Sequence, residues 1–344
     1  MSPTTKTILI SSLATGTIIT ASSHHWLMAW IGLEMNTLAI IPMISKQHHP
    51  RATEAATKYF LTQAAASTMI LFSSTTNAWQ TGTWDIINMT NPTANMLFTM
   101  AIAMKLGLAP MHFWLPEVLQ GSTIKTALII ATWQKLAPMA LIFTTSNNLS
   151  TTILLTMAMI STLLGGWAGL NQTQTRKIMA YSSITHLGWM AAISTIMPNI
   201  LLLNLTLYLL MTTSMFYTLI LLSSKNIKNM ATSSTTSPMV TASAMMTLLS
   251  LGGLPPLTGF MPKWLILEEL TTQNLTPTAT VLALSALLGL FFYLRLSYSS
   301  TITLAPNTTT AKHKWRFKLI TNPLMLTLTL PASLLLLPIT PMTC

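Results

Sequence analysis

Four ionisable side chains interrupt long apolar stretches of this sequence, where a charge is expensive to bury. They are Glu34, Lys105, Lys135 and Lys263. A charged residue at the centre of a membrane helix costs roughly 2.5–3.5 kcal/mol on insertion scales. Four such residues in one chain predict a functional site, and the chemistry that these residue types share is proton transfer.

The lysines are suited to carrying protons because an ammonium group, unlike a guanidinium, can release its proton inside a protein. One acid cannot neutralise three lysines, so at least one lysine is expected to exchange its proton near neutral pH. Moving a proton against about 150 mV costs roughly 3.5 kcal/mol. A neighbouring charge that approaches or leaves a lysine could supply that energy. The alternative is a structural ion pair between Glu34 and Lys105, although buried pairs are poor stabilisers.

Two histidines also lie within apolar stretches. His112 follows Lys105 by seven residues, and His186 lies in Tyr181-Ser-Ser-Ile-Thr-His186. Imidazole titrates near neutral pH, so both are candidate proton relays between the lysines. The alternative is an interior histidine that only makes hydrogen bonds. The two could in principle ligate one haem, but a single pair without a characteristic spacing gives that interpretation little support.

Composition defines the setting of these residues. Charged residues make up 7 % of the 344, against roughly 25 % in ordinary globular proteins. So few charges cannot cover a water-exposed surface, which predicts an all-α polytopic membrane protein. The net charge of +11 lies mostly in short loops, so we expect no nucleic-acid partner.

The single cysteine is the last residue, Cys344. One cysteine excludes a disulfide framework, and it excludes an iron–sulfur cluster, which takes about four cysteine ligands. We therefore expect this chain to bind no cofactor or metal and to carry no electrons itself.

Apolar stretches of about 20 residues, the length needed to cross a bilayer, predict eleven transmembrane helices. They run approximately over residues 4–22, 24–44, 56–76, 94–115, 124–145, 150–170, 178–197, 199–223, 238–261, 276–300 and 322–342. The basic residues test this count, because loops on the inner side of a membrane are enriched in Lys and Arg.

The basic residues segregate to one side of the predicted membrane. Alternation from the N-terminus places 13 of the 17 on the N-terminal side, namely Lys6, Lys46, Arg51, Lys58, Lys125, Arg176, Lys177, Lys225, Lys228, Lys312, Lys314, Arg316 and Lys318. A wrong count would mix the two sides, so we expect eleven spans with the N-terminus on the positive side. Arg295, near the end of its span on the same side, is expected to extend to the interface.

Two spans contain helix-breaking residues next to a lysine. Gly107 and Pro110 interrupt the fourth span after Lys105, and residues 255–262 interrupt the ninth before Lys263. Paired interruptions of this kind point to an ion site in transporter folds, and the freed backbone groups can line a polar cavity. Because the breaks are five spans apart, we expect two inverted five-helix repeats, 1–145 and 146–300, followed by a basic loop and one helix in 301–344.

The longest hydrophilic loop, 306–318, carries four basic groups and Trp315. Such a loop is typical of an interface with anionic lipid, such as cardiolipin, or with a partner subunit.

Five stretches resemble the antiporter-like subunits of respiratory complex I, and the resemblance runs the whole length of the chain. They are Trp30–Asn36, Lys105–Val118, Trp133–Pro138, Ala180–Trp189 and Gly252–Trp264. By motif match, Glu34 and Lys105 take the family's acid–lysine pair, Lys135 its central lysine and Lys263 its terminal proton-transfer lysine.

The resemblance implies a proton-pumping module in the membrane arm of NADH:ubiquinone oxidoreductase. It also implies two inverted repeats, each with a discontinuous helix. FMN, iron–sulfur clusters and ubiquinone would belong to the whole complex, and other core and accessory subunits would be its partners. The high Thr, Leu and Met content resembles organelle-encoded animal members. The expected location is therefore the mitochondrial inner membrane, with the N-terminus in the matrix and the C-terminus in the intermembrane space.

Two alternatives share the same helices and lysines. One is a stand-alone cation/proton antiporter, and the other is a purely structural membrane-arm subunit whose lysines form inert ion pairs. A structural subunit would tolerate neutral substitution of Lys135, whereas a complex I subunit would not be stable after purification alone.

Overall fold

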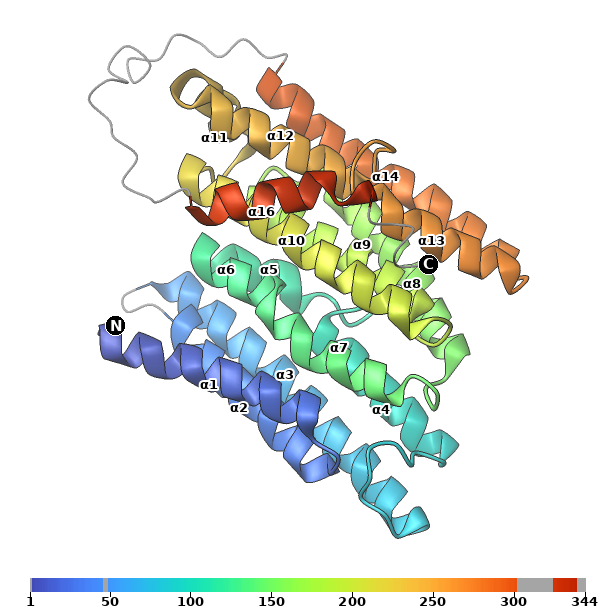
Figure 1. Cartoon of the computed structure of the whole chain (residues 1–344). Coiled ribbons are helices and arrows are strands. Elements are labelled where there is room, and N and C mark those ends of the chain that lie inside the picture. Colours follow the sequence, from blue (N-terminus) through green and yellow to red (C-terminus); the bar gives the residue numbers. More distant parts are fainter. Residues whose placement is uncertain (1, 46–48, 302–323, 339–344) are drawn as a thin grey trace. The chain divides into compact units, whose positions relative to one another are not determined.

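The computed structural model describes residues 2–45, 49–301 and 324–338, and within these ranges it is all-helical (Figure 1). Five helical stretches of the described residues are long and apolar enough to cross a membrane, and one of them, Ile124–Thr145, has an irregularity within it. The count of eleven spans and the inverted layout stay predictions. The basic loop 306–318 lies outside the described residues, and the last predicted span, 322–342, is described only over part of its length.

The chain divides into two compact units. The first comprises residues 1–161 and 190–198, and the second comprises residues 162–189 and 199–344. The first unit contains α1 (Pro3–Ser22), α2 (Trp26–Ile44), α3 (Pro50–Thr81), α4 (Pro92–Leu106), α5 (Trp114–Gly121), α6 (Ile124–Ala131) and α7 (Trp133–Thr145).

Two helices have residues in both units, α8 (Thr151–Gly169) and α9 (Thr175–Ile193). The second unit also contains all or nearly all of α10 (Pro198–Leu222), α11 (Ile227–Thr236), α12 (Pro238–Gly252), α13 (Phe260–Thr272), α14 (Thr276–Thr301) and α16 (Leu324–Leu335).

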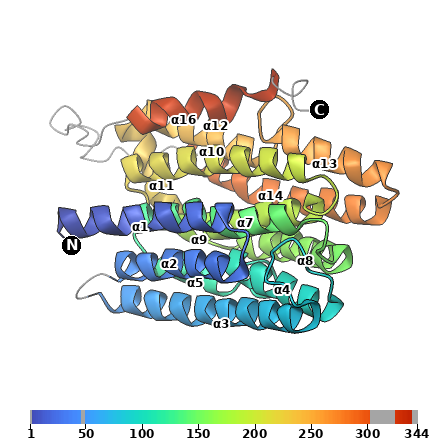
Figure 2. The ribbon, with the colours of Figure 1, turned by 60° about the horizontal axis from the view of Figure 1, so that its bottom comes forward.

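Small residues bring α1 and α2 into close contact, and the two helices run side by side in both ribbon views (Figures 1 and 2). A Cβ added at Gly16 would lie 2.9 Å from the Gly32 carbonyl oxygen, and one at Gly32 would lie 2.8 Å from the Gly16 carbonyl oxygen. Small residues at helix interfaces are the usual means of close packing in membranes. This crossing fixes α2, the helix that carries Glu34.

Both predicted helix breaks are present, one in each unit, and both begin at a glycine in the left-handed conformation. Gly107 ends α4 with φ 81°, and Gly253 ends α12 with φ 78°. L-residues with a Cβ rarely adopt this conformation, so glycine is the usual helix-ending residue. The chain then turns through a short irregular segment and resumes as α5 in the first unit and as α13 in the second.

The residues that follow Gly107 and Gly253 correspond in type at several positions. Aligning Gly107 with Gly253 pairs four further positions: Pro110 with Pro256, Trp114 with Phe260, Pro116 with Pro262, and Glu117 with Lys263. Lys105 has Leu251 at its matching position. The two breaks therefore have glycine, proline and aromatic residues at matching positions, but their lysines stand at different positions.

The predicted continuous helix 124–145 is interrupted before Lys135. The backbone leaves regular helix at Thr132, which separates α6 from α7. Pro138 lies four residues after Gln134, where its ring removes one helical hydrogen bond and crowds the Gln134 carbonyl. Because the apolar pattern is unbroken across Thr132, the sequence suggested one helix.

Arg295 was expected to extend to the interface, and the structure gives its side chain two backbone partners. Its guanidinium donates to the backbone carbonyls of Leu170 and Gln172, just after the C-terminal end of α8 at Gly169. A cation is favoured there because it satisfies free carbonyls at the negative end of the helix dipole. Arg295 therefore closes a helix end inside the second unit.

The second break is held against the last described helix. The Thr258 hydroxyl donates to the Ser333 carbonyl of α16, and the backbone at Gly259 lies against α12. A Cβ on Gly259 would stand 1.7 Å from the Ser250 carbonyl oxygen, whereas one on Gly252 would meet its nearest neighbour at 3.7 Å.

Gly259→Ala is therefore expected to displace the second break, at a cost of roughly 1–3 kcal/mol or more for overpacking. Thermal unfolding and the amount of assembled protein in the membrane measure the effect. Gly252→Ala, which adds the same methyl group where it fits, is the matched control and should be near neutral. Equal stability of the two variants would contradict this account of the break.

Candidate functional site

The side chain of Lys135, which belongs to α7, reaches the C-terminal end of the broken helix α4. Its side chain is 1 % exposed, and its ammonium donates to the Leu106 carbonyl, the last carbonyl before Gly107. The same nitrogen lies 5.4 Å from the centre of the Trp114 ring. The negative end of the α4 dipole, one free carbonyl and an aromatic face thus surround the ammonium, and each favours a cation.

Lys263 occupies the corresponding place in the second unit. Its ammonium donates to the Gly252 carbonyl over 2.8 Å, and Gly252 immediately precedes Gly253 as Leu106 precedes Gly107. Lys135 reaches its carbonyl from a separate helix, whereas Lys263 reaches back from the second half of its own broken helix. By backbone partner, the counterpart of Lys263 is therefore Lys135 and not Lys105.

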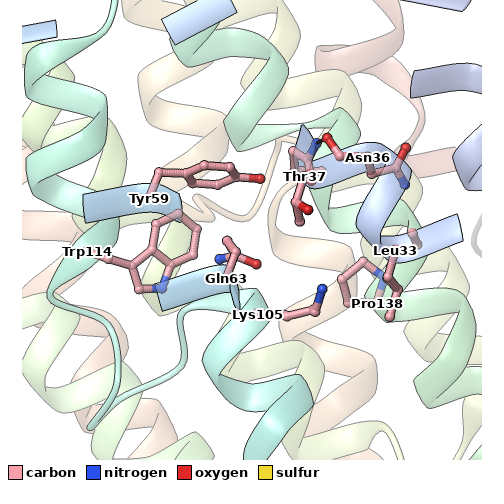
Figure 3. Close-up of a pocket in the computed structure, with 10 residues that line it drawn as sticks. Leu33, Asn36, Thr37, Tyr59, Gln63, Lys105, Trp114 and Pro138 are labelled. Atoms are coloured by element: carbon pink, nitrogen blue, oxygen red, sulfur yellow. Dashed lines mark hydrogen bonds between the residues drawn. The ribbon is translucent and has the colours of Figure 1, made fainter. Parts of the chain in front are cut away.

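Lys105 faces a small polar cavity in the first unit (Figure 3). It is 5 % exposed, and its ammonium has no hydrogen-bond partner among the described residues. The cavity is lined by Leu33, Asn36, Thr37, Tyr59, Gln63, Lys105, Trp114, Gln134, Ala137 and Pro138. A buried ammonium without a protein partner needs water or another polar ligand to remain charged.

Glu34 is partly buried on α2, and its charge is near enough to act on Lys105. No ion pair joins the two in the described part of the chain. Instead the Thr37 hydroxyl donates to the Glu34 carboxylate over 2.9 Å, and it also lies 2.9 Å from the Glu34 backbone carbonyl. The carboxylate is thus held on its own helix by Thr37 and is not paired with Lys105.

Several polar side chains of the cavity were not among the predicted site residues, and three of them have polar atoms that are unpaired within the described ranges. Tyr59 and Gln63 lie one turn apart on α3, and Asn36 lies on α2. The Tyr59 hydroxyl, the Gln63 amide nitrogen and both Asn36 side-chain polar atoms lack partners among the described residues. Polar residues four apart in the span 56–76 were the available signal, but spacing alone does not show which face of a helix is buried.

The two histidines have different surroundings. His186 is 5 % exposed and lines a second cavity together with Lys263, Thr185, Trp189 and Tyr293. His112 is 4 % exposed in the first break, where its ring packs against Phe113 with centroids 4.4 Å apart. The structure thus brings His186 beside Lys263, while His112 does not line the Lys105 cavity.

Glu117 lies outside the cavity and pairs with a surface lysine. Its carboxylate is 2.7 Å from the Lys58 ammonium, which is also 2.5 Å from Glu54, and all three side chains are about half exposed. The nearby ammonium holds the pKa of the Glu54 carboxyl below its ordinary value. Exposed pairs contribute little to stability, so this cluster is a surface feature of the first unit and does not belong to the cavity.

We expect ordered water in the Lys105 cavity, because nearly all buried polar atoms in proteins have a hydrogen-bond partner. A high-resolution density map of the assembled protein should show water within hydrogen-bond distance of the Lys105 ammonium, the Gln63 amide and the Tyr59 hydroxyl. Gln63→Met should remove the density beside residue 63. A dry cavity in such a map would contradict this expectation.

The apolar helices and the buried lysines beside two broken helices define a membrane protein of the transporter-like class. A family profile described as NADH:quinone oxidoreductase/Mrp antiporter, TM, matches residues 23–290, and one described as NADH dehydrogenase subunit 2 C-terminus matches residues 290–344. The chain therefore belongs to the NADH:quinone oxidoreductase/Mrp antiporter family, which confirms the resemblance seen in its motifs.

Similar proteins agree with this family over the whole chain. NADH-ubiquinone oxidoreductase chain 2 of Xenopus laevis is 56 % identical over 343 residues, covering 100 % of this chain and 99 % of the relative. The protein of the same name from Struthio camelus is 57 % identical over 344 residues, covering 99 % of each. A chain of respiratory complex I from Thermus thermophilus superposes with a TM-score of 0.81 at 27 % identity, over 96 % of this chain and 78 % of that one.

Proposed function

We propose that Glu34, Lys105, Lys135 and Lys263 carry protons in this chain, a proton-translocating membrane subunit of NADH:ubiquinone oxidoreductase. The observation that supports this most strongly is the pair of lysine ammonium groups, each hydrogen-bonded to the last carbonyl of a broken helix. His112 and His186 are candidate relays, and His186 has the better setting because it shares a cavity with Lys263.

The proposed cycle begins at Glu34. A charge change elsewhere in the complex alters the distance between the Glu34 carboxylate, now held by Thr37, and the Lys105 ammonium. Lys105 then passes its proton through the polar cavity to Lys135. From Lys135 the proton continues to Lys263 in the second unit and leaves on the intermembrane side.

The rest of the proposal follows from the family and from the sequence. FMN, the iron–sulfur clusters and ubiquinone belong to other subunits, and this chain's partners are other core and accessory subunits together with anionic lipid such as cardiolipin. We place the protein in the mitochondrial inner membrane as two inverted repeats, with its N-terminus in the matrix. The stand-alone antiporter is not favoured, since both full-length relatives carry the oxidoreductase name.

Lys105→Met should abolish or strongly lower proton pumping per NADH oxidised, because methionine keeps much of the side chain and cannot carry a proton. The measurement is made on the assembled complex in sealed vesicles, with NADH oxidation followed in parallel. Lys125→Met, which removes an exposed lysine at the start of α6, is the control and should pump normally. An unchanged ratio of protons to NADH in Lys105→Met would refute the role of this lysine.

Neutral substitution of Lys135 separates pumping from a purely structural role. Lys135→Met is expected to leave the complex assembled and to lower pumping, because methionine keeps much of the side-chain volume and cannot carry a proton. A structural subunit would instead pump normally after this change. Complex assembly on native gels and the proton-to-NADH ratio together decide between the two.

A further inference from the structure

Trp114 is bound to the same helix end as Lys135. Its indole nitrogen donates to the Met104 carbonyl over 3.1 Å, while the Lys135 ammonium donates to the Leu106 carbonyl two residues later. The indole is 6 % exposed and packs on Gly107, where an added Cβ would approach its ring to 3.4 Å. One helix terminus therefore fixes both the aromatic ring and the cation.

The ring also takes part in the Lys105 cavity. Trp114 lines that cavity and meets Tyr59 edge to face, with centroids 5.8 Å apart and planes at 63°. Figure 3 shows the indole beside Tyr59 and Gln63 at the side of the cavity. The same side chain thus contacts the Lys135 ammonium and borders the space into which Lys105 points.

We propose that Trp114 is a positioning residue that holds the charged form of Lys135 on the Leu106 carbonyl. This proposal rests on the proton role of Lys135 proposed above. The ring face attracts an ammonium and has little attraction for a neutral amine, so its hold weakens when the proton leaves and returns when a proton arrives. An interaction of this type between buried groups is expected to change occupancy of the carbonyl-bound position by about five- to thirtyfold.

The second unit provides an internal comparison. Phe260 stands at the position that matches Trp114, and its ring stacks on Trp264 with centroids 6.5 Å apart. Lys263 reaches its carbonyl from its own helix, three residues after Phe260. Lys135 comes from a different helix, so it has the greater need of a side chain that fixes its position.

The test compares variants of the assembled complex in sealed vesicles. Trp114→Met, which keeps apolar volume without a ring, should lower the protons pumped per NADH about fivefold or more, following the loss of the ring–cation attraction. Trp114→Phe keeps an aromatic face and should restore most of the pumping, although it cannot donate to Met104. Phe260→Met is the matched control and should pump as the unaltered complex does.

Three outcomes would overturn the proposal: normal pumping by an assembled Trp114→Met complex, Phe and Met variants that are equally impaired, or Phe260→Met impaired to the same degree. If Trp114→Met does not assemble, Trp114→Leu takes its place in the comparison with Trp114→Phe, and normal pumping by Trp114→Leu would contradict the proposed hold. Lys135→Met separates the two proposals. Normal pumping by that variant refutes the proton role itself, whereas lost pumping there with normal pumping by Trp114→Met refutes only the positioning role.

Discussion

A helix that stops inside an apolar protein leaves carbonyl groups without partners, and this constraint governs both units of the chain. Unsatisfied backbone groups are costly in a membrane interior, so each broken helix needs a donor at its end. The chain uses a lysine ammonium in both places, on Leu106 and on Gly252. In the proposed function, the ammonium group that satisfies the helix end is also the group that carries the proton.

This arrangement explains why the breaks and the lysines occur together. A continuous helix would offer the ammonium no free carbonyl, and a break without a cation would have a negative dipole end to neutralise. In the first unit the lysine comes from α7, next to the irregularity at Thr132, so two interrupted helices meet at Lys135. Lys105 differs from the two lysines that cap helix ends. Its ammonium faces a cavity, and its charge depends on what enters that space.

Complex I chemistry also limits what this subunit can do. One cysteine, at the last position, is fewer than the roughly four that an iron–sulfur cluster usually takes, and the share of energy conversion that we propose for this subunit is proton movement. The groups available for that share are few and mostly buried, and small shifts of one charge therefore act strongly on the next. The Thr37 hydroxyl contacts the Glu34 carboxylate, and the Trp114 ring lies beside the Lys135 ammonium.

The sequence by itself determined the membrane class, the helical fold, the two breaks and the buried ionisable residues, because composition, glycine and proline positions and isolated charges act locally along the chain. It also suggested that Lys105 and Lys263 correspond, since each stands beside a break. Only the tertiary structure assigned that correspondence to Lys135, showed Glu34 bound to Thr37, and brought Tyr59, Gln63 and Trp114 to the cavity. Those contacts join residues from different helices, and no local pattern specifies which helix faces another.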